Sequence, residues 1–340
     1  MDNFIFSINA TLPIFLTMIL GLFFRKIGVF DDAFTNKMNS FVFKFALPAL
    51  LFEDLWEENF YQAWDGGFVL FCFCATLGCI LVSTLLSSFL KDKSDRGEFI
   101  QASYRSSAAI LGIAFIVNIY GQSGMAPLMI IGTVPLYNIC AVAALTLTAP
   151  ATQATSTSQT ASTKSGVSNS ASANATSAVP STKVRLIRTA KGVITNPIIL
   201  GIAAGFAWSL LKLPHPVILQ KTVHNLGVLA TPLGLMAMGA SFDMKKAFYK
   251  MKPAFVCTFL KLLGYSGVLM PVAIALGYRN EALVAILVML GSATTVSSYT
   301  MAKSMGHEGT LSSSVVMLTT LLSAFTLTGW LFVLKTFALI

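Results

Sequence analysis

The chain is poor in charged residues. Only 11% of its 340 residues are Asp, Glu, Lys or Arg, less than half of the roughly 25% that is usual for soluble domains. Hydrophobic residues make up 55% of the chain, and the mean hydropathy is +0.74. A soluble protein of this size needs more charge to solvate its surface. The composition therefore excludes an ordinary cytosolic enzyme, and it excludes disorder over most of the chain.

The sequence also lacks the residue clusters that carry enzymatic chemistry. Its five Cys residues all lie inside apolar runs and have no zinc-ligand spacing. The three His residues have no Cys or carboxylate partner at catalytic or metal-binding spacing, and no Gly-Lys-Ser/Thr phosphate loop is present. We therefore expect a protein that is not an enzyme, holds no metal or cofactor, and is not driven directly by ATP.

What the sequence has instead is a series of long apolar runs. Each is about long enough to cross a hydrocarbon core of roughly 30 Å as a helix. In lipid, a helix forms all the hydrogen bonds of its own backbone. The runs do not show the alternation of apolar and polar residues that barrel strands have. The first run lacks the features of a signal peptide. The sequence therefore predicts an all-α membrane protein with ten transmembrane helices, at about residues 4–24, 36–56, 66–90, 98–119, 126–147, 186–211, 219–241, 253–277, 282–303 and 308–338.

The basic residues predict the orientation of these helices. Of the 23 Lys and Arg residues, 18, including Arg105, are assigned to one set of helix ends and four to the other. Cytoplasmic loops carry the excess of positive charge, which predicts a plasma (inner) membrane protein with both termini outside. The net charge of +9 then reflects topology and not a nucleic-acid surface. Lys44 and Lys261 lie inside runs, and we expect both to snorkel to the interface. The alternative is that they attract an anionic substrate.

A polar linker divides the chain. Residues 149–183 are almost entirely Ser, Thr, Ala, Asn and Gln, a composition that cannot bury a core and predicts a disordered cytoplasmic loop. The expected organisation is a first five-helix unit over residues 1–148, the linker, and a second five-helix unit over residues 184–340.

The two units share sequence motifs. The pattern P-I-x-L-x4-G occurs at 13–21 and again at 197–205, and A-x-P-x-x-L occurs at 46–51 and again at 230–235. Both pairs are offset by 184 residues. Because five is odd, the second copy enters the membrane from the opposite face. The sequence therefore predicts an inverted repeat, the architecture of many secondary transporters.

Polar residues interrupt the fourth and ninth apolar runs at equivalent places. These stretches are residues 103–112 and 291–299, and Ser107 plus 184 is Gly291. A broken helix offers a half-helix N-terminus that favours an anion; the alternative is that small residues only let helices pack closely. No Asp or Glu lies in the middle of any run, so no coupling carboxylate is apparent. The candidate substrate-binding residues are Ser106, Ser107, Asn138, Ser292, Thr294, Thr295 and Ser297.

Asn138 lies inside the fifth run, where a buried amide must find a partner. That partner is either a neighbouring broken helix or the substrate.

The chain resembles the auxin efflux carrier family over all ten runs, and five motifs carry the resemblance. They are Ala46–Phe52, Tyr137-Asn138, Asn196–Ile199, Ala230–Ser241 and Leu318–Ser323. The resemblance implies a carrier of a small organic anion, such as malonate or an auxin-like acid, with a fold like that of bile-acid and sodium–proton carriers. It further implies a scaffold of helices 1, 2, 6 and 7, often with a homodimer contact. Helices 3–5 and 8–10 would form a mobile unit in which helices 4 and 9 are broken and cross.

The chain departs from the family at these crossings. Family members commonly have an Asn and a Pro in the fourth helix, where this chain has Ser107 and Ala114. They commonly have prolines in the ninth helix, where this chain has Thr294 and Thr295.

Two functions are compatible with these residues. The first is secondary transport of an organic anion by elevator-type alternating access, with uniport driven by the membrane potential. The second is a membrane-embedded ligand sensor that retains the carrier fold without turnover, an interpretation suggested by the missing prolines.

Overall fold

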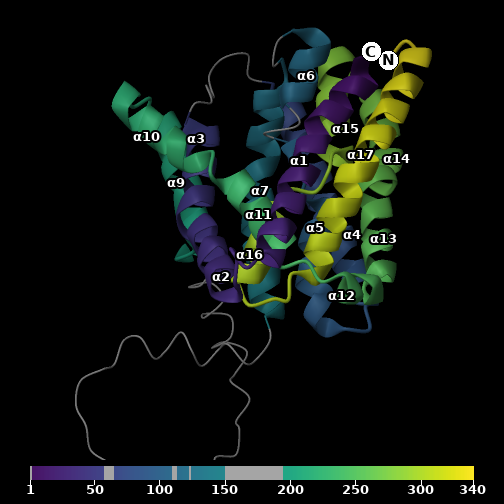
Figure 1. Ribbon diagram of the computed structural model, residues 1–340. Helices are drawn as coiled ribbons and strands as arrows, with labels where there is room; N and C mark the ends of the chain where they lie inside the picture. The colour runs from purple at the N-terminus through teal and green to yellow at the C-terminus, as the bar shows by residue number, and fades with distance from the viewer. Residues whose placement is uncertain (1, 57–64, 109–112, 122–123, 150–193) are drawn as a thin grey trace, which may run out of the picture.

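A computed structural model describes residues 2–56, 65–108, 113–121, 124–149 and 194–340 (Figure 1). Apart from Ala149, the predicted linker and the start of the sixth apolar run lie outside these ranges. Every regular element within them is a helix. Figure 1 shows the start of the first helix and the end of the last at the same end of the helical body.

The helices follow the predicted apolar runs closely. Several runs contain two helices or a helix with a short π-helical turn. In chain order they are α1 (Asp2–Lys26), α2 (Asp32–Phe41), η1 (Val42–Ala46), α3 (Leu47–Trp56), α4 (Gly66–Ser87), η2 (Lys93–Asp95), α5 (Arg96–Tyr104), α6 (Ile113–Tyr120), α7 (Ala126–Thr148), α9 (Pro197–Leu210), α10 (Val217–Gly227), α11 (Ala230–Ala240), α12 (Met244–Tyr249), α13 (Met251–Phe259), η6 (Leu260–Gly264), α14 (Tyr265–Ala275), α15 (Asn280–Gly291), α16 (Ser297–Ser304) and α17 (Thr310–Thr336).

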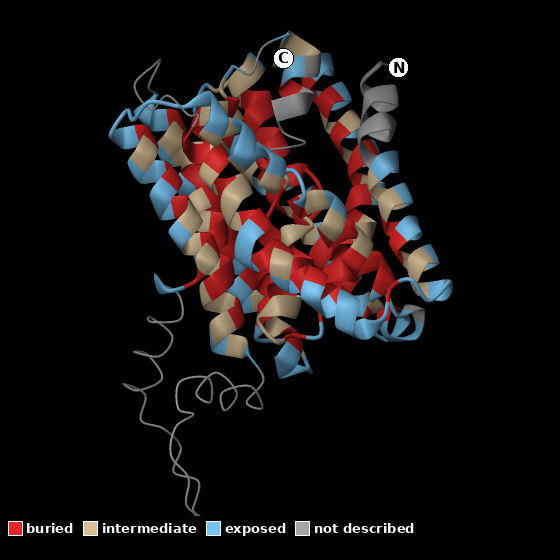
Figure 2. Cartoon of the chain, turned by 60° about the vertical axis from the view of Figure 1, so that its left-hand side comes forward, coloured by how far each residue is buried: buried red, intermediate tan, exposed pale blue. Residues whose placement is uncertain are grey.

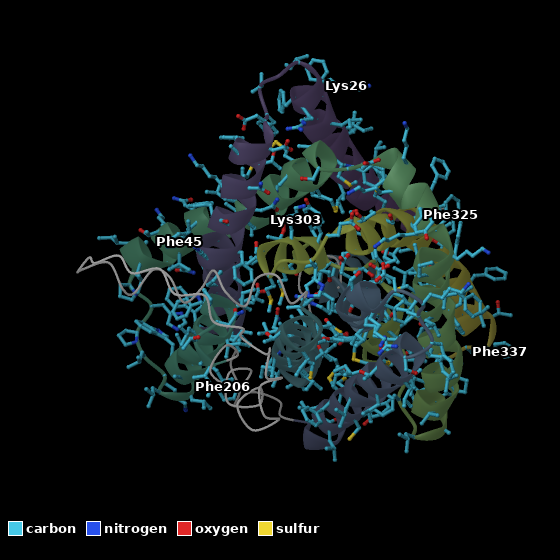
Figure 3. The ribbon with its side chains drawn as sticks, turned by 90° about the horizontal axis from the view of Figure 1, so that it is seen from below. Lys26, Phe45, Phe206, Lys303, Phe325 and Phe337 are labelled. Atoms are coloured by element: carbon cyan, nitrogen blue, oxygen red, sulfur yellow. The ribbon has the colours of Figure 1, made fainter. Side chains whose placement is uncertain are left out.

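The outside of this body is apolar. By length and composition, five segments of the described chain can each cross a membrane: 66–87, 126–148, 217–240, 251–275 and 310–336. Large hydrophobic side chains are exposed on many helices, and Figure 3 shows Phe45, Phe206, Phe325 and Phe337 on the rim of the body. Exposed apolar surface of this extent is typical of a protein that lies in a bilayer.

Glycines bring α1 against α11 and α3 against α9. A Cβ added to Gly21 would collide with the backbone of Met236, and one added to Gly205 would lie 2.6 Å from the carbonyl oxygen of Phe52. Such small residues allow helices to approach closely in membranes. The two contacts are related by the same offset, because Gly21 plus 184 is Gly205 and Phe52 plus 184 is Met236. The 184-residue offset of the motifs therefore recurs in these two contacts.

The fourth and ninth apolar runs are both interrupted. In the fourth, α5 ends at Tyr104 and Arg105 is extended, with ψ 131°. In the ninth, α15 ends at Gly291, Ser292 is extended with ψ 164°, and α16 begins at Ser297. Neither interruption contains a proline. Both lie within the stretches that the sequence singled out.

The interrupted ninth run lies at the centre of the molecule. Every residue of α15 from Leu283 to Gly291 is buried, and Figure 2 shows buried residues filling the middle of the body. A helix that is apolar on all sides is suited to such a position. Its C-terminal end is therefore held by packing from every side.

A cluster of charges lies at the end opposite the termini. The Lys250 ammonium lies 2.5 Å from the Asp95 carboxylate and 3.1 Å from that of Glu308. Lys246 also pairs with Glu308, at 2.7 Å. The pKa of the Glu308 carboxyl is lowered, chiefly by the hydrogen bond from Lys246. The cluster joins η2 of the first half of the chain to α12 and the turn before α17 in the second half.

Replacing Gly205 by alanine is expected to destabilise the protein, because its Cβ would meet the backbone of α3. Overpacking of this kind costs about 1–3 kcal/mol. Thermal unfolding in detergent measures the effect. The matched control is Gly78→Ala in α4, where an added Cβ meets nothing within 4 Å. Equal melting temperatures for the two variants would contradict the close α3–α9 contact.

Candidate functional site

The two interruptions satisfy each other's polar groups. The Ser107 amide donates a hydrogen bond to the Ala293 carbonyl oxygen at 3.0 Å. The Thr294 hydroxyl donates to the carbonyl oxygen of Ala102 at 2.9 Å. A helix that stops inside an apolar environment leaves backbone groups that need partners. Here each broken run supplies partners to the other.

A shared acceptor lies where the two helix ends approach. The Met289 carbonyl oxygen, in the last turn of α15, accepts from the Ser106 hydroxyl at 2.7 Å. It also accepts from the Tyr137 hydroxyl of α7 at 3.2 Å. The side chains of Ser106 and Tyr137 are therefore fixed by the end of α15.

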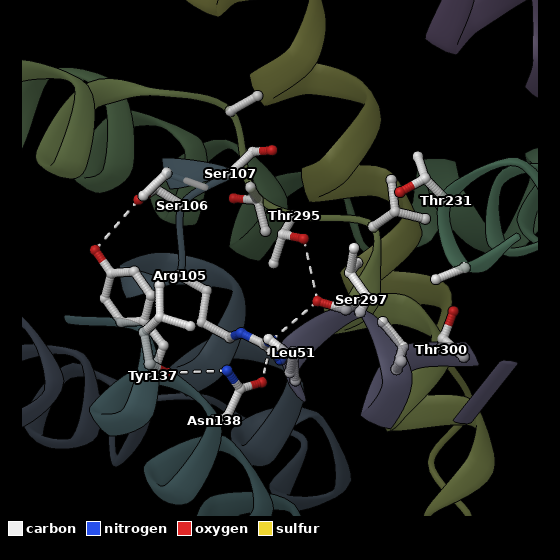
Figure 4. Close-up of a pocket in the computed structure, with 18 of the residues that line it drawn as sticks. Leu51, Arg105, Ser106, Ser107, Tyr137, Asn138, Thr231, Thr295, Ser297 and Thr300 are labelled. Atoms are coloured by element: carbon white, nitrogen blue, oxygen red, sulfur yellow. Dashed lines mark hydrogen bonds between the residues drawn. The ribbon is translucent and has the colours of Figure 1, made fainter. Parts of the chain in front are cut away.

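A cavity of about 190 Å³ lies beside these breaks (Figure 4). It is bounded by both interruptions, by α7, and by residues of α1, α3, α11 and α17. Pockets for drug-sized ligands usually measure about 300–1,000 Å³. The cavity is therefore suited to a small ligand.

Six of the seven residues singled out from the sequence line this cavity. They are Ser106, Ser107, Asn138, Thr294, Thr295 and Ser297. Ser292 does not line it; this residue is 1% exposed, and its hydroxyl has no hydrogen-bond partner within the described chain. The structure thus brings the hydroxyls of both breaks together, with Ser292 packed behind them.

Arg105 is placed differently from the sequence prediction. It was expected at the cytoplasmic helix ends, but it lies in the fourth-run interruption, is 3% exposed and lines the cavity. The reason is the end of α5 at Tyr104, which turns the extended Arg105 inward. The assignment to the interface was wrong.

The Arg105 guanidinium reaches residues from three elements. Its Nη2 donates to Asn138 Oδ1 and to Ser297 Oγ, each at 2.9 Å. Its Nη1 donates to Gln101 Oε1 at 3.4 Å and to Met301 Sδ at 2.7 Å. Figure 4 shows the side chain directed toward Asn138 and Ser297. Asn138 is held in turn by its own donation to the Val134 carbonyl oxygen at 2.9 Å. Asn138 therefore bonds a broken helix and lines the cavity as well.

The positive charge of Arg105 has no ion-pair partner within the part of the chain that the structure describes. Its Nε is buried without a hydrogen-bond acceptor among those residues. The cavity wall also includes a carboxylate, that of Asp54 in α3, which the sequence did not single out as a site residue. Four neutral acceptors thus hold the guanidinium, and such a cation favours an anion beside it.

Lys261 also departs from its prediction. It does not snorkel, because its side chain is 0% exposed in the interior. Its ammonium donates to the backbone carbonyls of Tyr104 and Met289, at 3.2 and 3.4 Å. Lys44, by contrast, is exposed. The negative ends of two helices thus hold the Lys261 cation inside, where the sequence predicted that it would reach water.

The depth of Arg105 inside its apolar run could have identified it as a site residue from the sequence. It lies seven residues beyond the start of the run at 98, and an ionisable residue inside a transmembrane run marks a functional site by default. Because Arg105 was assigned to the helix ends, its depth in the run was not used to predict a site. Within the described residues, no group of three or more His, Cys, Asp or Glu side chains is placed to hold a metal ion.

A family model described as membrane transport protein matches residues 6–331. A search of curated proteins finds no match. The family match spans both halves of the chain and includes every residue that lines the cavity.

Replacing Thr294 by valine is expected to destabilise the protein by about 1–3 kcal/mol, because the buried Ala102 carbonyl would lose its donor at nearly constant side-chain volume. Thr84→Val is the control, since Thr84 is exposed and bonds only within α4. Thermal unfolding of both purified variants measures the difference. Equal stability would show that the Thr294 hydroxyl does not hold the breaks together.

Proposed function

Because the chain belongs to the membrane transport protein family, we propose that it is a secondary carrier of small organic anions. Arg105 binds the carboxylate of the substrate. The hydroxyls of Ser107, Thr295 and Ser297 complete the ligand shell. The observation that carries this proposal is the buried Arg105 guanidinium at the wall of a small cavity, without an ion pair among the described residues.

The geometry of Arg105 suits a carboxylate. A guanidinium presents parallel N–H donors that match two carboxylate oxygens. Its present acceptors, which are Gln101, Asn138, Ser297 and Met301, are all neutral. A substrate carboxylate carries a negative charge and would therefore compete with them for the donors. The cavity of about 190 Å³ favours a compact acid such as malonate or lactate over a large amphiphile.

The proposed architecture is ten transmembrane helices in two inverted five-helix repeats, over residues 1–148 and 184–340, with the linker 149–183 in the cytoplasm. The repeated glycine contacts, Gly21 with Met236 and Gly205 with Phe52, support it. The basic residues support a plasma-membrane protein with both termini outside.

The cavity lies between two groups of helices that could move against each other. Its lining comes from α3 and α11 on one side and from the broken runs and α7 on the other. We assign α1, α2, η1, α3, α9, α10 and α11 to a scaffold that also forms a homodimer. The remaining membrane helices form an elevator unit that carries Arg105. Movement of this unit would expose the cavity to each face in turn.

No carboxylate lies in the middle of an apolar run, which favours uniport over coupling through a buried acid. A membrane potential of 100 mV is worth about 2.3 kcal/mol per charge. That energy suffices to expel a monovalent anion against roughly a 50-fold gradient, since 1.4 kcal/mol corresponds to a factor of about ten.

A sensor that retained the carrier fold is the alternative. The missing crossover prolines suggested this interpretation. Both runs are interrupted without prolines, and their absence therefore gives the sensor less support. Binding of an anion without flux would favour the sensor.

Uptake of radiolabelled malonate, lactate and indole-acetate into proteoliposomes tests the carrier. We expect saturable flux of at least one acid in the native protein. Arg105→Met should reduce it at least tenfold because the cation is removed, whereas Arg105→Lys should retain part of it. Arg279→Met, at an exposed arginine beyond α14, is the control. Native flux that survives Arg105→Met would overturn the site, and absence of flux with every acid would overturn the assignment to carboxylates.

Asn138→Asp offers a second test that does not remove the cation. A carboxylate at Oδ1 would lie 2.9 Å from Nη2 of Arg105 and would compete with the substrate for it. We expect a stable protein whose apparent affinity for the transported acid falls at least tenfold. An unchanged KM would show that the substrate does not approach this guanidinium.

A further inference from the structure

Lys261 places a second cation in the interior, behind the cavity wall. It lies in η6, a single π-helical turn between α13 and α14, and its side chain is completely buried. Single π-turns are frequent at functional positions in helices. Lys261 is not among the residues that line the cavity, so it does not touch a substrate bound there.

The ammonium lies between the C-terminal ends of α5 and α15, the first helices of the two broken runs. It donates to the carbonyl of Tyr104, the last residue of α5, at 3.2 Å, and to that of Met289, in the last turn of α15, at 3.4 Å. The last carbonyls of a helix lack intrahelical partners and carry partial negative charge. Two such ends brought together repel each other unless a cation lies between them.

The charge of Lys261 has no other counterpart in the described part of the chain. The ion pairs found there do not include it. Its surroundings include the Cys79 and Cys257 side chains, which are ordinarily neutral. The helix ends are therefore the groups that compensate the ammonium.

Lys261 is connected to the substrate cavity through one atom. The Met289 carbonyl oxygen accepts from Lys261 and also from Ser106 and Tyr137, both of which line the cavity. On the other side, Tyr104 directly precedes Arg105. Withdrawal of the ammonium would release both helix ends and shift the groups that face the substrate.

We propose that the Lys261 ammonium is a tethered cation at the crossing of the broken helices, where it replaces a bound coupling ion and makes anion binding independent of sodium. Lys261 is thus a positioning residue for the cavity. The part that concerns the anion rests on the proposed function, whereas the part that concerns the cation site does not.

The first experiment needs no substrate. Thermal unfolding of purified Lys261→Ala is measured in choline chloride and after addition of sodium or methylammonium chloride. The substitution removes the ammonium and leaves a space between two sets of carbonyls, so we expect sodium or methylammonium to raise its melting temperature in a concentration-dependent way. Native protein and Lys44→Ala, which alters an exposed lysine in the π-turn η1, should show no such cation-specific rise.

Lys261→Met separates charge from packing. Methionine fills much of the same space without a charge, so we expect this variant to be less stable than the native protein and to be unresponsive to either cation. A stability equal to that of the native protein would show that Lys261 only fills space, and would overturn the proposal. A folded Lys261→Ala that no cation stabilises would overturn it too.

The second experiment measures malonate binding by calorimetry. Native protein should bind malonate equally in sodium and choline chloride. Lys261→Ala should bind it about tenfold more weakly in choline, with recovery in sodium or methylammonium, because two linked sites affect each other reciprocally. Sodium-dependent binding to the native protein would overturn the tethered-cation proposal. If the native protein binds no malonate while the thermal experiment succeeds, the choice of anion fails and the cation site stands.

Discussion

The structure depends on one constraint: two helices stop inside a body that offers no water to their free backbone groups. In lipid, an unsatisfied backbone group costs several kcal/mol. The chain meets this cost by placing the two breaks against each other, where the Ser107 amide bonds Ala293 and the Thr294 hydroxyl bonds Ala102. Lys261 bonds the two helix ends. The inward direction of Arg105 follows, because it is the first residue after the end of α5.

The sequence predicted those structural features that depend on a single apolar run or motif. The apolar runs predicted the helices. The polar stretches predicted both interruptions, because clustered hydroxyls inside an apolar run are costly unless they find polar partners there. Arg105 and Lys261 were misplaced for a common reason. A cation about two turns from a helix end either snorkels or stays inside, and its neighbours decide which. Those neighbours, such as Asn138 for Arg105 and Met289 for Lys261, come from other parts of the chain.

The proposed repeat accounts for the matched helix contacts but not for the charges. The contact of Gly21 with Met236 recurs as that of Gly205 with Phe52. The position equivalent to Lys261 is Leu77, 38% exposed on α4, so the second cation has no counterpart in the first half. If the chain is duplicated as proposed, shared residues maintain the fold that both copies need. Residues that differ are free to serve one function, which makes the unmatched Lys261 informative.

Because the crossing contains no proline, its two helix interruptions depend on tertiary hydrogen bonds. A proline interrupts a helix locally and removes an N–H that would otherwise need a partner. Here the interruptions are held by tertiary bonds, and Ser106 and Thr294 both hold the helix ends and face the cavity. An anion that draws on these hydroxyls and on Arg105 must therefore alter the bonds that fix the breaks. Occupancy of the cavity and the geometry of the crossing are thus linked through the same side chains, which is what a carrier requires if a loaded and an empty unit are to differ.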